Sequence, residues 1–177
     1  MNSLNPKLPD VCRDYLATTS YWEAITEYTS DAYLTINRYL REGGWLEARD
    51  RVTHKALAAA FAELEPFDGL IKVFRAFTLP REEIGLVVQR LLNARNDGRI
   101  IQMKGYLSCT TNRHLTSTRT APIELVILAN CGLDARPASV SPLEDEFLLN
   151  HDSSFLVRKV RRPAGEGQVV VKLEQIA

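Results

Sequence analysis

Three consecutive carboxylates make residues 141–149 the stretch of this sequence best suited to chemistry. Pro142 introduces a turn, Glu144, Asp145 and Glu146 follow, and three apolar residues come next. If this stretch is a strand, Glu144 and Glu146 project from one face and Asp145 from the other. Carboxylates held this close raise each other's proton affinity, so they require a cation or a hydrogen-bond donor nearby. The simpler alternative is a solvated acidic turn.

Two further residues lie in runs that predict strands and could serve such carboxylates. Arg75 lies in the apolar run at residues 70–77, and Ser108 lies in the Gly-Tyr-Leu-Ser-Cys-Thr-Thr stretch at residues 105–111. The arginine fork can bind phosphate oxygens with two parallel hydrogen bonds. A serine hydroxyl can donate to a carboxylate. The alternatives are that Arg75 pairs with a structural carboxylate and that Ser108 is an ordinary cross-strand hydroxyl.

Helices are predicted in the first part of the chain. Ser20 and Glu23 form a capping box for the first helix, which is expected to end at Gly43 and Gly44. Apolar residues recur within it at spacings of three and four, which indicates an amphipathic helix. The residues expected to face inward are Tyr21, Ile25, Tyr28, Ala32, Ile36 and Tyr39.

A second helix is expected between Asp50 and Pro66, before the strand at residues 70–77. Its expected inward residues are Val52, Ala56, Ala60 and Leu64. A third helix is predicted to open at Pro80 and to end near Gly98. Its expected inward residues are Ile84, Val87, Val88, Leu91 and Leu92.

The rest of the chain predicts strands separated by turn residues. The predicted strands are residues 99–108, 123–130, 134–140, 146–149, 155–160 and 168–176. Helices first and strands afterwards indicate an α+β fold, with N-terminal helices packed on a mainly antiparallel sheet. We expect residues 1–19 to form an N-terminal arm and residues 20–177 to form a single domain.

The bulk composition argues against several classes of protein. Lys plus Arg and Asp plus Glu number 22 each, so no net field attracts nucleic acid or an anionic membrane. No segment has signal-peptide character or approaches the roughly 20 apolar residues of a membrane span. Three scattered cysteines predict reduced thiols in a cytosol rather than a disulfide framework or a zinc site. A metal-dependent hydrolase would need histidine or aspartate partners for the acidic triplet, and none stands at ligand spacing.

Taken in order, Arg75, Ser108 and the Glu144-x-Glu146 pair resemble the motifs of the R-S-E class of mono-ADP-ribosyltransferases. That class includes bacterial toxins, plant-pathogen effectors and vertebrate ecto-enzymes. Residues 27–30 and 36–41 are also similar to the helix that precedes the arginine strand in many members, so the resemblance extends over roughly residues 20–160. It implies a split, mainly antiparallel β-sheet core of ADP-ribosyltransferase type, with NAD as substrate and no metal.

The resemblance also implies roles for individual residues. Glu146 would stabilise the ribosyl cation that forms when nicotinamide leaves, and Ser108 would hold Glu146 in place and help to bind NAD. Arg75 would bind a phosphate of NAD. Further residues expected to contact NAD are Phe74 and Tyr106, which could stack on its rings, and Thr110, as a hydroxyl donor. Cys109 should alternate away from the site.

Glu144 would decide the acceptor, because a glutamate two residues before the catalytic one accompanies arginine targets in the resembled family. A guanidinium keeps its proton at neutral pH and is a poor nucleophile until a base removes that proton. A nearby carboxylate attracts the cation and can accept the proton. We therefore expect a target protein that bears an acceptor arginine.

One segment departs from the family pattern and leaves alternatives open. The segment at residues 112–122 is short and polar, and it lacks the phenylalanine that most members carry there. An NAD glycohydrolase and a nucleic-acid ADP-ribosyltransferase are the alternative enzymes, although the balanced charge disfavours nucleic acid. A non-catalytic binding module with a degenerate ADP-ribosyltransferase fold is the alternative of another class.

The sequence suggests biology only through this resemblance. We expect a monomer with no membrane contact, either cytoplasmic or delivered into the cytosol of a target cell as part of a larger toxin or effector. An immunity protein is a further expected partner of such a toxin.

Overall fold

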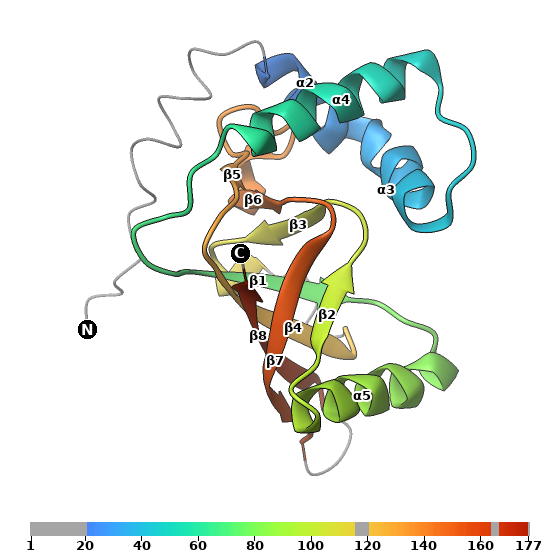
Figure 1. Ribbon diagram of the computed structural model, residues 1–177, viewed down its shortest axis with the longest axis vertical. Helices are drawn as coiled ribbons and strands as arrows, with labels where there is room; N and C mark the ends of the chain where they lie inside the picture. Colours follow the sequence, from blue (N-terminus) through green and yellow to red (C-terminus); the bar gives the residue numbers. More distant parts are fainter. Residues whose placement is uncertain (1–20, 116–120, 164–166, 177) are drawn as a thin grey trace.

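The computed structural model describes residues 21–115, 121–163 and 167–176 of the 177-residue chain. Helices come first and an eight-stranded sheet follows, with one helix, α5, inserted after the first strand (Figure 1). The helices are α2 (Trp22–Glu27), the π-helical η1 (Tyr28–Ala32), α3 (Tyr33–Glu42), α4 (Ala48–Ala62) and α5 (Arg81–Asn96). Two short 3-10 turns are η2 (Arg113–Leu115) and η3 (Pro142–Glu144). The predicted α+β class is confirmed.

The strands form one mixed, mainly antiparallel sheet in the order β2-β7-β8-β4-β1-β3-β6-β5. They are β1 (Ile71–Phe77), β2 (Ile100–Met103), β3 (Leu107–Thr110), β4 (Ile123–Ala129), β5 (Leu133–Asp134), β6 (Glu146–Leu149), β7 (Ser153–Arg161) and β8 (Val169–Ile176). Of the described pairs, β4 with β8 is parallel and the others are antiparallel. Within the part of the chain that the structure describes, β1 and β3 are in register only at Phe74 and Thr110, so the sheet is nearly split there.

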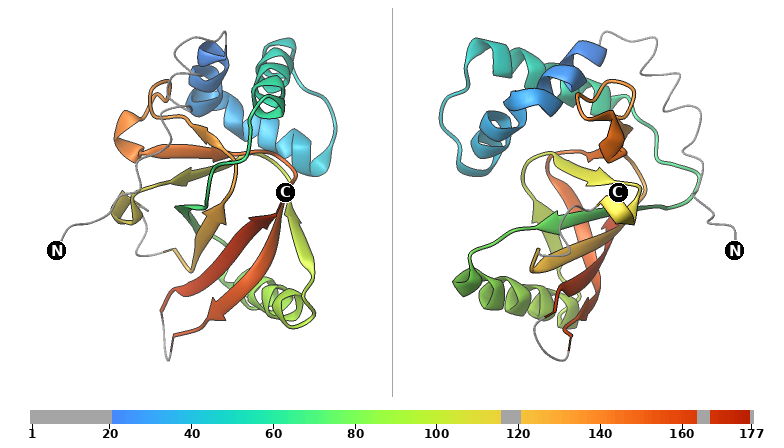
Figure 2. Two further views of the ribbon diagram at one scale, coloured as in Figure 1. Left: turned by 60° about the vertical axis from the view of Figure 1, so that its left-hand side comes forward. Right: turned by 180° about the vertical axis from the view of Figure 1, so that it is seen from behind.

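Each half of the split sheet has its own core. Helices α2 to α4 gather over β3, β5 and β6, whereas α5 lies at the opposite end of the molecule beside β7 (Figures 1 and 2). Cys109 and Phe147 pack with the α5 core, whereas Tyr106 and Leu148 pack with the helical core. The short strands β3 and β6 therefore join the two cores, and the residues at their ends lie where the two halves meet.

The first predicted helix is confirmed as the continuous segment α2-η1-α3. Its buried residues include Ile25, Tyr28 and Ile36, as the periodicity indicates. It ends at Gly43, whose amide donates to the Tyr39 carbonyl at 2.8 Å. The capping-box residue Ser20 lies outside the described residues.

The second predicted helix is present as α4, but its inward face was partly wrong. Val52 is 67% exposed, and the buried residues are Thr53, Leu57, Ala60 and Phe61. Leu57 and Phe61 stand four positions apart, so they lie on one face of the helix. These two large side chains bury more apolar surface than an alanine stripe, so they decide which face turns inward.

Two predicted strands are wrong in extent, whereas the other strands and α5 are confirmed. Residues 99–108 divide into β2 and β3, because Gly105 adopts a φ of +96° that breaks the run. Residues 134–140 yield only the end of β5. The chain then turns, and the amide of Ser139 donates to the Ala135 carbonyl at 2.7 Å. Proline at position 137 favours this turn over a longer strand.

Candidate active site

Glu146 is the first residue of β6 and is only 7% exposed. Ser108 Oγ donates to its Oε1 at 2.7 Å, and Ser139 Oγ donates to its Oε2 at 2.7 Å. Both oxygens of the carboxylate thus accept a hydrogen bond from a hydroxyl. Hydrogen bonds to an ionised group are stronger than neutral ones, so the two serines orient the carboxylate and offset part of the cost of its burial.

The register of β3 and β6 explains the contact between Ser108 and Glu146. Thr110 is the direct partner of Glu146, and Ser108 is the direct partner of Leu148. Residues two apart on a strand share a face, so Ser108 and Glu146 are diagonal neighbours on the same face. The Cys109 side chain points away from it into the α5 core, where burial raises the pKa of its thiol to about 12.

Ser139 was not identified from the sequence, because residues 134–140 were predicted as a strand. In the structure it lies in the turn after β5, and its Oγ also accepts a hydrogen bond from the Ser141 amide at 3.1 Å. A hydroxyl residue seven positions before Glu146 is too common to attract notice. The turn at Pro137 and the pairing of β5 with β6 are what bring it to the carboxylate.

The Arg75 side chain contacts the backbone of Ser108. One terminal nitrogen of its guanidinium donates to the Ser108 carbonyl, and its Cζ lies 5.2 Å from the centre of the Phe77 ring. Within the described residues, no carboxylate lies within ion-pair distance of it, and its buried Nε has no hydrogen-bond partner. The alternative that Arg75 serves a structural carboxylate therefore has no support in these contacts.

Glu144 does not lie on a strand, so the predicted alternation with Glu146 was wrong. Glu144 ends the 3-10 turn η3, and Asp145 adopts the left-handed conformation with a φ of +47°. The left-handed residue separates the turn η3 from β6. Glu144 is left exposed beside the buried Glu146.

Contacts on both sides of Asp145 hold this left-handed residue. Its carbonyl accepts from the Thr111 amide at 3.2 Å. Arg136 NH1 lies 4.0 Å from its carboxylate, and Nε and NH2 of the same guanidinium donate to the two carboxylate oxygens of the buried Asp134, each at 2.7 Å. The loop that presents Glu144 is thereby attached to both β3 and the turn after β5.

Two pockets meet at these residues. One of about 380 Å³ is lined by Arg75, Ser108, Glu144 and Glu146 together with residues of η1 and α3. Another, of about 520 Å³, is lined by Arg75, Ser108 and Glu144 together with Phe74 and residues from β3 to η2. The structure thus gathers the four motif residues around one opening, although they come from separate parts of the sequence.

The remaining predicted residues divide between this opening and the core. Phe74 and Thr110 line the second pocket, and the Thr110 hydroxyl accepts from the Asn112 amide at 3.1 Å. Tyr106 is different, because it is 2% exposed and stacks on Phe61 with ring centres 5.6 Å apart. Its hydroxyl lies 3.1 Å from His54 Nδ1. Tyr106 is therefore a core aromatic residue, and the expectation that it stacks on NAD was wrong.

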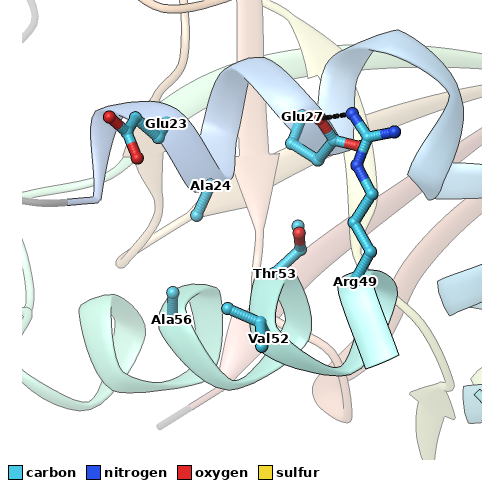
Figure 3. A pocket seen from close by; sticks show the side chains of 7 residues that line it. All are labelled: Glu23, Ala24, Glu27, Arg49, Val52, Thr53 and Ala56. Carbon is cyan, nitrogen blue, oxygen red and sulfur yellow. Dashed lines mark hydrogen bonds and ion pairs between the residues drawn. The ribbon is translucent and has the colours of Figure 1, made fainter. Parts of the chain in front are cut away.

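A separate groove of about 380 Å³ lies between α2 and α4 (Figure 3). Its lining includes Glu23, Glu27 and Thr53, and Glu27 forms an ion pair with Arg49 across it. It shares no lining residue with the two pockets at Glu144.

Two further features are absent from the described residues. No group of three or more His, Cys, Asp or Glu side chains in residues 21–115, 121–163 and 167–176 could hold a metal ion. No helix in the same ranges is long and apolar enough to cross a membrane.

The sequence model for the ADP-ribosyltransferase exoenzyme family matches residues 3–176, nearly the whole chain. The chain belongs to this family of ADP-ribosyltransferases. The family and fold implied by the resemblance in the sequence are confirmed.

Similarity to individual members of the family is low. Secreted exoenzyme S of Pseudomonas aeruginosa is 25% identical over 134 residues, which cover 76% of this chain and 28% of that protein. The chain spans less than a third of the length of the curated relatives it matches.

Solved structures in the family share the fold. Exoenzyme S in complex with human 14-3-3 protein beta and Carba-NAD has a TM-score of 0.74 at 20% identity, covering 97% of this chain and 84% of that one. C3stau2 from S. aureus with NAD has a TM-score of 0.76 at 17% identity, covering 99% of this chain and 97% of that one.

Proposed function

We propose that this chain transfers a single ADP-ribose from NAD to arginine side chains of a target protein. The observation that carries the proposal is the pairing of two different carboxylates at one opening: Glu146 is buried and held by two hydroxyls, whereas Glu144 is exposed. A buried, oriented carboxylate suits stabilisation of a cation, and an exposed one suits contact with an incoming protein.

Cleavage of NAD does not require a general acid at this site. When the bond between the nicotinamide nitrogen and ribose C1′ breaks, the bonding electrons return to the pyridinium ring, which leaves as neutral nicotinamide. The positive charge develops on the ribosyl group, and Glu146 lies in the pocket as its stabilising anion. Such charge exists mainly in the transition state, so a fixed carboxylate lowers the barrier more than it strengthens ground-state binding. The hydrogen bonds from the hydroxyls of Ser108 and Ser139 hold the Glu146 carboxylate in place.

Arg75 can bind a phosphate of NAD through the guanidinium N–H groups that make no hydrogen bond within the described residues. One terminal nitrogen donates to the Ser108 carbonyl, and Nε has no partner in the described residues. A phosphate accepts two parallel hydrogen bonds from such a fork. The solved structures of exoenzyme S with Carba-NAD and of C3stau2 with NAD support NAD as the substrate of this fold.

Glu144 supports arginine as the acceptor. Its exposed carboxylate attracts the guanidinium and accepts the proton that the attacking nitrogen loses as it forms the bond to C1′. The products are then nicotinamide, an N-linked ADP-ribosyl arginine and one proton passed through Glu144 to solvent. With water in place of arginine the same site would act as an NAD glycohydrolase.

The biological setting is proposed from the relatives. They include secreted exoenzymes of Pseudomonas aeruginosa, of which this chain matches less than a third of the length. We place the chain as the catalytic domain of a bacterial toxin or effector that acts on a protein inside a target cell.

Intact-protein mass spectrometry tests the reaction. The chain is incubated with NAD and an arginine-rich acceptor protein, beside Glu146→Gln and Glu144→Gln variants. We expect additions of one ADP-ribose to the acceptor with wild type, and a loss of about a hundredfold to a thousandfold in both transfer and nicotinamide release with Glu146→Gln. With Glu144→Gln we expect nicotinamide release to persist without transfer.

Three other outcomes would contradict the proposed transfer to arginine or the role of Glu144 in it. Transfer by Glu144→Gln at the wild-type rate would exclude arginine activation by that residue. Nicotinamide release without transfer by wild type would favour a glycohydrolase. If wild type does neither, calorimetry with NAD would distinguish a fold that binds without turnover from one that does not bind.

A further inference from the structure

The outer face of strands β7, β8, β4 and β1 carries a cluster of positive charge. Among the described residues, no carboxylate lines the pocket of about 390 Å³ on this face. The cations that line it are Lys72, Arg113, Lys159, Arg161 and Lys172. Between them lie the partly buried side chains of Phe74, Val126 and Val170. We call these eight residues the basic face.

Most of this charge is not neutralised within the protein. Arg113 forms a bidentate pair with the buried Glu124, at 2.8 and 2.6 Å. The other four cations have no carboxylate within ion-pair distance among the described residues. The whole chain has equal numbers of acidic and basic residues. The basic face is therefore a local segregation of charge in a protein with no net charge.

The strand register concentrates the charge further. Lys159 and Lys172 are direct partners across β7 and β8, where like charges destabilise a sheet. A β-bulge precedes Lys159: from Val157 to Lys159, β7 advances two residues while β8 advances one. Without this bulge Lys159 would stand opposite Val171, which is fully buried. The bulge thus turns Lys159 outward beside Lys172, a placement that costs stability and that an anionic partner would offset.

The basic face borders the candidate active site. Phe74 lines both the basic face and the pocket that contains Arg75, Ser108 and Glu144. The turn η2 also borders both, since Arg113 lines one and Leu115 the other. A polypeptide bound on the basic face can therefore present a neighbouring side chain at Glu144.

We propose that the basic face docks an acidic segment of the acceptor protein, and this rests on the proposed function. Carboxylates of the segment pair with the lysines, and its apolar side chains cover the floor between them. A nucleic acid fits less well, because bases bind by stacking on successive aromatic side chains and this face offers one. A bilayer also fits less well, since the apolar floor is partly buried within the sheet and cannot insert.

A binding measurement tests the docking surface without any catalysis. A short fluorescein-labelled peptide of alternating Glu and Leu is titrated with the full chain, followed by anisotropy at low and physiological salt. We expect Lys159→Glu/Lys172→Glu to weaken binding by about tenfold or more, and wild-type binding to weaken with salt. The matched control is Lys55→Glu/Arg90→Glu, which makes the same change of charge at exposed positions of α4 and α5 and should bind as wild type does.

Three binding results would overturn the proposal. The first is that wild type does not bind the peptide, and the second is that the control variant loses as much affinity as the test variant. The third is that a single-stranded oligonucleotide or a phosphatidylserine vesicle binds more tightly than the peptide, with the same dependence on Lys159 and Lys172.

A kinetic measurement links docking to transfer. With a protein acceptor whose arginine adjoins an acidic segment, Lys159→Glu/Lys172→Glu should raise KM by about tenfold. Transfer to the small guanidino acceptor agmatine should match wild type, as should nicotinamide release. An unchanged KM for the protein acceptor would overturn docking while leaving the proposed function standing. Absence of any transfer by wild type would instead overturn the proposed function, and the peptide titration would still decide the docking surface.

Discussion

Ser139 and Glu146, seven residues apart, are joined by a hydroxyl-to-carboxylate hydrogen bond of 2.7 Å to Oε2. Ser108 serves the other oxygen, so neither serine alone orients the carboxylate. We predict that Ser139→Ala lowers kcat for nicotinamide release by about tenfold to a hundredfold, because a hydrogen bond to a charged group contributes about 1.5–3 kcal/mol. Steady-state kinetics check this, with KM for NAD little changed.

Two further variants test whether the Ser139 hydroxyl itself is responsible. Ser139→Thr keeps the hydroxyl and should recover most of the rate, and Ser108→Ala should reduce kcat at least as much as Ser139→Ala. Wild-type kcat in Ser139→Ala would show that Ser108 alone suffices.

The left-handed residue Asp145 sets the position of Glu144 relative to Glu146. Valine is strongly disfavoured at positive φ, so we predict that Asp145→Val destabilises the protein by about 1–2 kcal/mol. It should also lower the ratio of transfer to nicotinamide release, because Glu144 moves. Urea unfolding and the two rates measure these effects.

Asp152 provides the matched control for Asp145. It also has a positive φ, of 62°, but it is exposed in the turn between β6 and β7. Asp152→Val should cost similar stability and leave the ratio of rates unchanged. An equal fall of that ratio in both variants would mean that general destabilisation, rather than the position of Glu144, is responsible.

Gly105 separates β2 from β3 at a φ of +96°, and a Cβ there would lie 2.9 Å from Oδ1 of Asn37. The Asn37 amide donates to the carbonyl of Tyr106 at 3.1 Å, so it has little freedom to move. We predict that Gly105→Ala costs about 1–3 kcal/mol of stability from backbone strain alone, with the contact adding to this. Gly98→Ala is the control, because its φ is +63° and a Cβ there meets nothing within 4 Å. Equal shifts of the urea midpoint in the two variants would contradict a steric role for Asn37.

His54 makes the stability of the folded protein depend on pH. Its partial burial, and to a lesser degree the charge of His151, lower its pKa from the usual value of 6.5. Below that pH the unfolded chain binds a proton at this residue that the folded protein does not, so acid favours unfolding. We predict that the free energy of unfolding falls as pH drops below about 6.5, and falls less in His54→Gln. His114→Gln, at an exposed position on η2, is the control and should follow wild type.

The sequence alone determined the elements whose information is local. Apolar spacings of three and four predicted α2-η1-α3 and α5, and branched apolar runs predicted β1, β4 and β6, because burial of a stripe or a face depends on the period of the side chains. Arg75, Ser108, Glu144 and Glu146 were recognised as candidate site residues from their types and their order along the chain, which resemble the motifs of the family.

What the sequence left undecided depended on contacts between distant segments. Whether residues 134–140 extend or turn, and hence whether Ser139 reaches Glu146, depends on how β5 pairs with β6. Tyr106 turned out to be a core residue because the helices cover that end of β3. The inward face of α4 and the gathering of the five lysines and arginines of the basic face were also decided by tertiary structure. Local patterns specify which side chains share a face of an element, and only the packing of elements decides what that face meets.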